Sequence, residues 1–255
     1  MAEPVVSRAD LELLARFDTA TVCNALEVLR PECRSAGYTR RPLLAARPDL
    51  APVVGLARVG AIRAAAAPRP GSVPERVSWY EYVAAAELPT MVVIEDRDAE
   101  PGTGAFWGEV NSLVHKTLGA AGCVTNGSFR DVTALADGFQ ILGSHVGPSH
   151  AHVHIVEFGK PVDVCGMLVH HDDIVHADYQ GAVVIPADCV AGVTASSRDG
   201  VCGTGGSVAS PPPPQAIVAA DRTPAIVTTH RERVRSACIG APLTQSAASG
   251  SRSTM

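Results

Sequence analysis

The sequence predicts a mixed α/β fold with a β-rich C-terminal half, and two observations support this prediction. Residues 89–96 form an apolar run that ends in acids, which is typical of a strand buried on both faces. A glycine-rich loop at 101–104, a helical stretch at 108–121 and a second strand at 123–126 complete a right-handed βαβ unit. Farther along, short strand-like runs follow one another between residues 139 and 185.

Local patterns predict the remaining elements. A helical region at 11–29 is expected to break near Phe17, and Asp18 is a suitable N-cap because its carboxylate can accept hydrogen bonds from exposed amides. Residues 53–63 have the β-branched and small side chains of a strand, and residues 77–86 are expected to be helical. The later short strands are expected at 139–146, 150–158, 161–169, 174–177 and 182–185, and a terminal helix at 186–193.

The length of 255 residues fits one large domain with an appended tail. Residues 1–194 are predicted to form that domain, and residues 195–255 a Pro/Ser-rich C-terminal extension that is partly flexible. The proline run at 211–214 favours an extended polyproline segment, and a helix or arm is expected at 216–234.

Composition argues against several functional classes. The net charge is -5 and there is no long basic run, so nucleic acid is not expected to be a partner. The sequence has no secretory signal pattern and no run of about 18 apolar residues, so no membrane association is expected. Seven scattered cysteines without a CxxC pair are typical of reduced thiols in a cytoplasmic protein.

Gly108 and Glu109 open a predicted helix directly after the glycine-rich loop. The first turn of a helix presents unpaired amides and a partial positive charge, so it suits a small carboxylate or a phosphate. The alternative is an ordinary helix start, in which Glu109 merely favours the helix dipole.

Arg130 and Asp131 follow the second strand of the βαβ unit. Ligands of open α/β sheets bind outside the carboxyl ends of the parallel strands, so this pair and the helix start should face one crevice. Asp131 can ligate a hard cation such as Mg²⁺. The Arg130 guanidinium can bind a carboxylate or stabilise an enolate oxygen. In the alternative, Arg130 makes a structural ion pair and Asp131 caps the following helix.

His150, His152 and His154 would share one face of a regular strand, where three imidazoles could bind Zn²⁺, Fe²⁺ or Mn²⁺. Glu157 would lie on the opposite face, so it would not complete such a site. A polar, water-lined or interface strand is the alternative. Residues 178–181 are predicted to form a turn between two short strands. The acids of this region, Asp172, Asp173 and Asp178, could be ligands, but a turn role is favoured.

In this order and combination, the motifs resemble the RraA-like, 4-hydroxy-4-methyl-2-oxoglutarate aldolase family over roughly residues 10–190. The resemblance implies a swivelling, phosphohistidine-domain-like α/β sandwich that assembles as homotrimers or dimers of trimers, with active sites between subunits. The matching motifs are Asp18-Thr19-Ala20-Thr21-Val22-x-Asn24-Ala25, Gly108-Glu109, Gly119-x-x-Gly122, Gly127-x-x-Arg130-Asp131 and the run from Asp173 to Pro186.

The family's enzymes are class II pyruvate aldolases that also decarboxylate oxaloacetate, so the resemblance implies a small 2-oxo acid substrate. By the same resemblance, Asp131 would hold Mg²⁺ or Mn²⁺, directly or through water, and Arg130 would contact the pyruvoyl oxygen. The backbone amides of Gly108, Glu109 and Val110 would receive the substrate carboxylate, and Glu109 would help to position metal-bound water.

The sequence departs from the family pattern in three places. Asp172 replaces a glycine before Asp173, and the histidine-rich stretch at 150–154 is not a general family feature. The chain beyond Val190 does not match the usual C-terminal helix, and Glu232 is not assigned to the acid that aldolase members take from a neighbouring subunit.

Two other functions are considered beside the lyase. Some relatives bind and inhibit a ribonuclease without catalysis, but they tend to lack the acid that follows the arginine, so the presence of Asp131 favours an enzyme. The other possibility is a metal enzyme of a different chemistry that uses the histidine-rich stretch.

Overall fold

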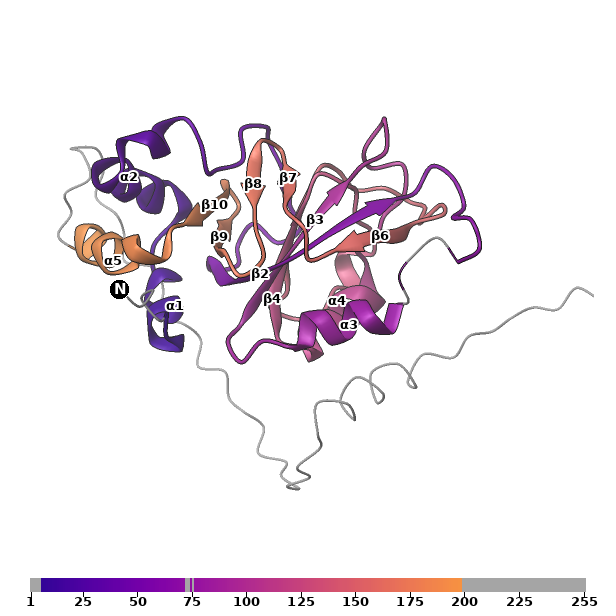
Figure 1. The fold of residues 1–255 in the computed structure, drawn as a ribbon, viewed down its shortest axis with the longest axis horizontal. Helices are drawn as coiled ribbons and strands as arrows, with labels where there is room; N and C mark the ends of the chain where they lie inside the picture. The colour runs from indigo at the N-terminus through magenta and orange to yellow at the C-terminus, as the bar shows by residue number, and fades with distance from the viewer. Residues whose placement is uncertain (1–5, 72–73, 75, 199–255) are drawn as a thin grey trace, which may run out of the picture.

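The structure is a computed structural model, and it describes residues 6–71, 74 and 76–198. One curled sheet forms its centre, with two helices on one face, a β-hairpin on the other, and three helices gathered at one end (Figure 1). This arrangement confirms the predicted mixed α/β class with a β-rich second half. Within the described ranges, no helix combines the length and apolarity that a bilayer crossing requires.

The predicted C-terminal extension lies almost wholly outside the described residues, including the prolines at 211–214 and the helix expected at 216–234. The last described helix continues to Arg198, slightly past the predicted domain boundary at residue 194. That boundary therefore stays a prediction.

The elements agree closely with the sequence patterns. The α-helices are α1 (Arg8–Leu14), α2 (Thr19–Leu29), α3 (Arg76–Ala84), α4 (Glu109–Thr117) and α5 (Val190–Arg198). Short 3₁₀ turns are η1 (Pro31–Arg34), η2 (Val132–Ala134) and η3 (Ala187–Cys189). The strands are β1 (Leu44–Ala45), β2 (Val53–Arg63), β3 (Thr90–Asp96), β4 (Ala120–Thr125), β5 (Gln140–Gly143), β6 (His154–Phe158), β7 (Val162–Val164), β8 (Met167–Val169), β9 (Ile174–Asp178) and β10 (Gly181–Ile185).

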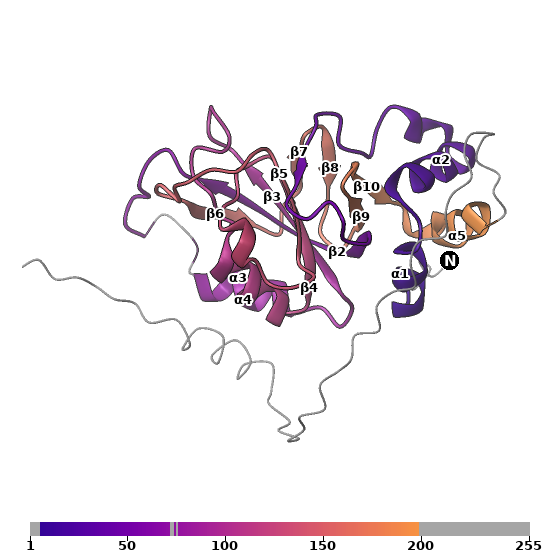
Figure 2. The same cartoon turned by 180° about the vertical axis from the view of Figure 1, so that it is seen from behind.

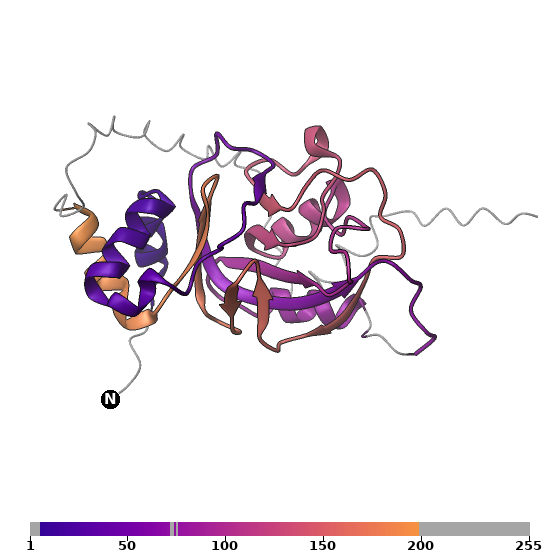
Figure 3. The same ribbon diagram turned by 90° about the horizontal axis from the view of Figure 1, so that it is seen from above.

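The main sheet has the order β1-β5-β4-β3-β2-β9-β10. Strands β2, β3, β4 and β5 are parallel to one another, so β3, α4 and β4 form the predicted βαβ unit. The long strand β2 pairs with β9 over its first half and with β6 over its second half, both antiparallel. The pairing of β2 with β6 contains a register shift between Ala61 and Ile62, and the sheet curls into a half-barrel (Figure 3).

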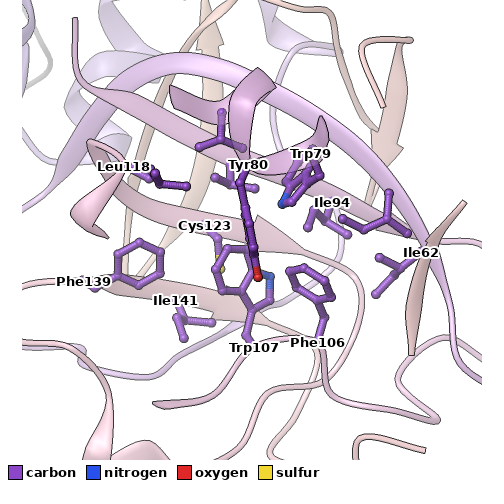
Figure 4. Packing of buried hydrophobic residues seen from close by; sticks show 14 of the residues in the cluster. Ile62, Trp79, Tyr80, Ile94, Phe106, Trp107, Leu118, Cys123, Phe139 and Ile141 are labelled. Atoms are coloured by element: carbon purple, nitrogen blue, oxygen red, sulfur yellow. The ribbon is translucent and has the colours of Figure 1, made fainter. Parts of the chain in front are cut away.

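Both faces of the parallel strands are buried, as the apolar run in β3 predicts. One face packs against α3 and α4, where Trp79, Tyr80, Phe106 and Trp107 form an aromatic core (Figure 4). The other face packs under the β7–β8 hairpin. A strand between two apolar layers cannot alternate polar and apolar residues, which explains its continuous hydrophobic pattern.

Helices α1, α2 and α5 pack together at the β9–β10 end of the sheet (Figures 2 and 3). Asp18 caps α2 as predicted, since its side chain accepts a hydrogen bond from the Thr21 amide at 2.7 Å. Asp178 ends β9 and accepts the Thr19 amide at 2.8 Å, so it anchors α2 to the sheet. The predicted turn at 178–181 is confirmed, and Asp178 has this structural role.

A neutral histidine links α3 to α4. His115 is fully buried, and the Trp79 indole N–H donates to its Nε2 at 2.9 Å. Its Nδ1 lies 2.7 Å from the Asn111 carbonyl, which can only accept, so Nδ1 carries the proton. Burial lowers the pKa of His115 from its ordinary value of 6.5 to about 4.

We expect this burial to make stability depend on pH. Between pH 6.5 and 4 the unfolded chain protonates His115 while the folded protein does not, so the free energy of unfolding should fall by about 3 kcal/mol across that window. Above pH 6.5 both states are neutral and the effect vanishes. Urea unfolding of the wild type and His115→Gln at pH 7 and pH 4 measures the difference, and parallel pH profiles would contradict it.

Several predicted elements are wrong in their extent. The run expected as one strand at 161–169 forms the two strands β7 and β8, because Cys165 with φ 56° and Gly166 with φ 88° turn the chain between them. The helix expected at 186–193 begins only at Val190, after the 3₁₀ turn η3. The strand expected at 150–158 begins only at His154, because Ala151 adopts a left-handed conformation with φ 44° and interrupts the extended chain. His150, His152 and His154 therefore do not line one face of a regular strand. The helix expected at 108–121 also ends earlier, at Thr117, where Gly119 with φ 98° turns the chain into β4.

Candidate active site

A cavity of about 660 Å³, lined by both polar and apolar residues, lies beyond the carboxyl ends of β3 and β4. The first turn of α4 borders it, together with Arg130 and Asp131 from the loop after β4. The histidine-rich stretch at 150–154 forms another wall. The remaining lining residues are Pro68, Arg76, Ala105, Phe106 and Asn111.

All five residues singled out as site residues from the sequence lie together at this cavity: Gly108, Glu109, Val110, Arg130 and Asp131. Their proximity follows from the βαβ unit, because loops that leave parallel strands at the same edge meet there. Their roles toward substrate and metal stay predictions.

The backbone places Asp131 directly against the start of α4. Phe129 is fully buried and forms an isolated parallel β-bridge with Trp107. The Arg130 amide donates a hydrogen bond to the Trp107 carbonyl at 2.9 Å. Asp131 then adopts a left-handed conformation with φ 54°. Aspartate tolerates that conformation better than most residues, and it turns the side chain back toward the helix.

The Asp131 carboxylate faces α4 and not the short turn that follows it. Its Oδ2 lies 3.5 Å from the Glu109 amide nitrogen and 3.2 Å from Nε of Arg130. Although Asp131 precedes η2, its side chain makes no capping hydrogen bond there. The capping role considered from the sequence is therefore wrong, whereas the ion pair with Arg130 is present.

Gly108 leaves the space that this arrangement needs. A Cβ at that position would lie 2.6 Å from Oδ2 of Asp131 and 3.2 Å from Cγ of Arg130. Both side chains remain more than one third exposed, so they are accessible to a ligand in the cavity.

A buried acid holds the glycine-rich loop in place. The Asp96 carboxylate accepts hydrogen bonds from the Gly102 amide at 2.7 Å and the Asp98 amide at 3.0 Å. Burial raises the pKa of Asp96. The Asn126 side chain also joins the ends of β3 and β4, through the Asp96 amide and carbonyl. These contacts tie the glycine-rich loop and the ends of β3 and β4 together beside the cavity.

The histidine-rich stretch rests on the glycine-rich loop. The Ala105 amide donates to the Ser149 carbonyl at 2.9 Å, and a Cβ on Gly104 would meet the His150 carbonyl at 2.6 Å. His150, His152 and His154 all line the cavity, but a loop and not a strand brings His150 and His152 there.

The sequence comparison decides the family. The RraA-like family, described as Aldolase/RraA, matches residues 19–184, which is more than half of the chain. The chain belongs to the Aldolase/RraA family. The matched region of this RraA-like chain contains helices α2 and α4, the Arg130-Asp131 pair and strand β9, and it ends one residue before the end of β10.

Solved structures share the RraA-like fold. Streptomyces coelicolor RraAS2, described as an unusual member of the RNase ES inhibitor RraA protein family, has a TM-score of 0.60 and 24% identity, over 76% of this chain and 92% of that chain. An uncharacterized protein from Pseudomonas syringae has a TM-score of 0.58 and 16% identity, over 76% and 87%. A search of curated proteins finds no match.

The backbone geometry gives a physical reason for one departure from the motif that the resemblance implied. Asp172, which stands where the resemblance implies a glycine, has φ 65°. Glycine adopts this left-handed conformation without strain, and aspartate is among the side chains that tolerate it. In this RraA-like chain the extra carboxylate pairs with the buried Arg58, so the substitution adds a contact.

The carboxylates at the cavity fit a hydrated divalent cation. Asp131 is accessible and Glu109 also lines the cavity, and Mg²⁺ is commonly held by one or two carboxylates while it keeps several waters. Within the described residues, no group of three or more His, Cys, Asp or Glu side chains could hold a metal ion. The predicted three-histidine metal site therefore has no support here.

Sequence reasoning missed Arg76 and Asn111, which also line the cavity. Arg76 begins α3, about 30 residues before the motif, and nothing in its neighbourhood signals a site. Asn111 lies one turn into α4, and its side chain donates to the Phe106 carbonyl. A polar residue near a predicted helix start was the only available signal for Asn111.

Proposed function

We propose that this RraA-like chain is a divalent-metal-dependent lyase that acts on a small 2-oxo acid as a class II pyruvate aldolase, an oxaloacetate decarboxylase, or both. The supporting observation is that the helix start, Arg130 and Asp131 border the same cavity. These groups combine anion-binding amides, a guanidinium and an accessible carboxylate, which is the set that an enolate-forming reaction needs.

Each group has a distinct role toward the substrate. The amides of Gly108, Glu109 and Val110 bind the substrate carboxylate, assisted by the positive end of the α4 dipole. Arg130 donates to the 2-oxo oxygen and stabilises the negative charge that develops there. Asp131 would hold Mg²⁺ or Mn²⁺, and Glu109 would help to position a water on it. When bound, the cation supplies Lewis-acid stabilisation of the same charge.

Aldol cleavage and β-decarboxylation both generate the pyruvate enolate, so one site can serve both reactions. A lysine imine is not part of this proposal. Lys116 lies on α4 away from the cavity, with its ammonium against the Asp137 carbonyl, and Lys160 pairs with Glu157. Electrostatic stabilisation of the enolate takes the place of an imine.

We also propose the finer structural features that the family resemblance implies. These are the swivelling, phosphohistidine-domain-like arrangement and assembly into homotrimers or dimers of trimers with sites between subunits. The open position of the cavity, with its two half-exposed charged side chains, leaves room for a neighbouring subunit to contribute to the site.

The competing function is a non-catalytic regulator that binds a ribonuclease. Streptomyces coelicolor RraAS2, which is described as a member of an RNase ES inhibitor family, shares the fold. The acid at Asp131, at the cavity and against the helix start, favours the lyase over this alternative.

The proposal is tested with purified protein that has been stripped with a chelator. Pyruvate release should be assayed from oxaloacetate and from 4-hydroxy-4-methyl-2-oxoglutarate, with and without added Mg²⁺ or Mn²⁺. We expect no turnover above the metal-only background in the stripped protein and restored turnover with either metal. Absence of turnover of either substrate under all conditions, together with binding to a ribonuclease, would support the regulator instead.

A further inference from the structure

His154 is the most firmly placed histidine at the cavity. It is the first residue of β6, it pairs with Arg63 of β2, and its side chain is half-buried. His150 is exposed and belongs to the loop before the left-handed Ala151. A side chain on a strand is held more precisely than one on a loop, so His154 is the best placed for chemistry.

Backbone contacts determine which nitrogen of His154 is reactive. Its Nδ1 lies 2.7 Å from the His152 carbonyl oxygen, and a carbonyl can only accept a hydrogen bond. In the neutral imidazole, Nδ1 therefore carries the proton and Nε2 has the free lone pair. Among the described residues, none makes a hydrogen bond to Nε2 of His154.

The surroundings of His154 favour an anionic ligand beside it. Arg76 and Arg130 line the same cavity, as does the positive end of α4. A 2-oxo acid held by its carboxylate at the helix start would extend its remaining carbons into the space that the histidine-rich stretch borders. His154 borders the cavity that would hold the carbons beyond the pyruvoyl group.

We propose that His154 transfers the proton in the aldol cleavage of a 4-hydroxy-2-oxo acid. This inference rests on the proposed function. Nε2 takes the proton from the C4 hydroxyl, the C3–C4 bond breaks, and C4 becomes a carbonyl. The electron pair of the broken bond passes to the pyruvate fragment as its enolate. The imidazolium then returns the same proton to C3, so one substrate gives pyruvate and a second carbonyl compound with no other reactant.

Decarboxylation of oxaloacetate does not require His154 as a base. Oxaloacetate has no hydroxyl proton to remove, because CO₂ itself leaves with cleavage of the C3–C4 bond. Only the return of a proton to C3 remains, and water can supply it. His154 should therefore matter far more for aldol cleavage than for decarboxylation.

The test compares the two reactions in His154→Gln. Loss of a general base typically costs 10²–10⁴-fold, so we expect kcat for cleavage of 4-hydroxy-4-methyl-2-oxoglutarate to fall by about 10²–10³-fold. Oxaloacetate decarboxylation should fall by less than about tenfold. In His154→Ala, added imidazole should partly restore aldol cleavage. His145→Gln is the matched control, because His145 is exposed and does not line the cavity.

Several outcomes would overturn the assignment. Equal losses in both reactions, or a higher KM with unchanged kcat, would show that His154 only binds substrate or supports the fold. A larger loss of cleavage in His150→Gln would transfer the role to that residue. A wild type that decarboxylates oxaloacetate but cleaves no 4-hydroxy-2-oxo acid would refute this inference alone, whereas a wild type with neither reaction would refute the proposed function.

Discussion

Asp131→Asn is expected to lower kcat/KM for oxaloacetate decarboxylation by about 10³-fold, because the variant loses the charge that we propose holds the cation. The fold should survive the change. Asparagine has nearly the same volume and tolerates the left-handed φ of 54° at this position. Both side chains of the lost ion pair, Asp131 and Arg130, are more than one third exposed. Such pairs contribute about 0–1 kcal/mol to the free energy of unfolding.

The measurement combines steady-state kinetics with a titration of Mg²⁺ or Mn²⁺ and urea unfolding. Asp137→Asn is a matched control, since the Asp137 side chain is fully exposed and pairs only with Arg47 at 3.6 Å among the described contacts. Activity and metal dependence should be unchanged in this control. Full activity of Asp131→Asn at the same metal concentration would remove Asp131 from the site.

A second large effect is expected at the pair of Arg58 and Asp172. The Arg58 guanidinium is almost fully buried in the sheet, contacts Asp172, and lies 5.6 Å from the centre of the Tyr82 ring. Its Nε has no hydrogen-bond partner among the described residues. The Asp172 side chain is half-exposed, so the two members of the pair differ in how easily water can replace a lost partner.

We therefore expect the two single substitutions to differ in their effects. Asp172→Asn keeps a residue that tolerates φ 65° but leaves a buried cation unpaired, which should lower the free energy of unfolding by about 2–3 kcal/mol. Arg58→Met leaves an acid that water can hydrate, and should cost less than about 1 kcal/mol. The Ala57 carbonyl, which Arg58 also contacts, keeps its hydrogen bond from the Asp172 amide.

A double-mutant cycle in urea unfolding measures this coupling. In the Arg58→Met background, Asp172→Asn should lower the free energy of unfolding by less than about 0.5 kcal/mol, because no buried charge is left without a partner. Additive effects of the two substitutions would show that the pair does not contribute to stability.

Much of the fold is predictable from local sequence patterns. The apolar run at 89–96 and the helix after it were sufficient to predict the βαβ unit, because a parallel strand buried on both faces has a distinctive composition. Asp18 was identified as an N-cap from residue type and position alone. Such features depend on interactions within a few residues, so they are visible in the sequence.

The candidate site was predictable in part. Arg130, Asp131 and the first turn of α4 could be expected at one edge, since parallel strands bring their carboxyl ends together. The direction of the Asp131 carboxylate could not be expected. It depends on a left-handed backbone and on the contact of Phe129 with Trp107, which residue patterns do not report.

By itself, the sequence determined the class of fold, the order of its elements and the chemical groups available to the cavity, because periodicity and residue type encode these features locally. Only the tertiary structure decided how the histidines lie. A left-handed Ala151 and close packing on Gly104 bend the chain before β6, so three alternating histidines become a loop and a strand end. Contacts between segments far apart in the sequence impose that bend.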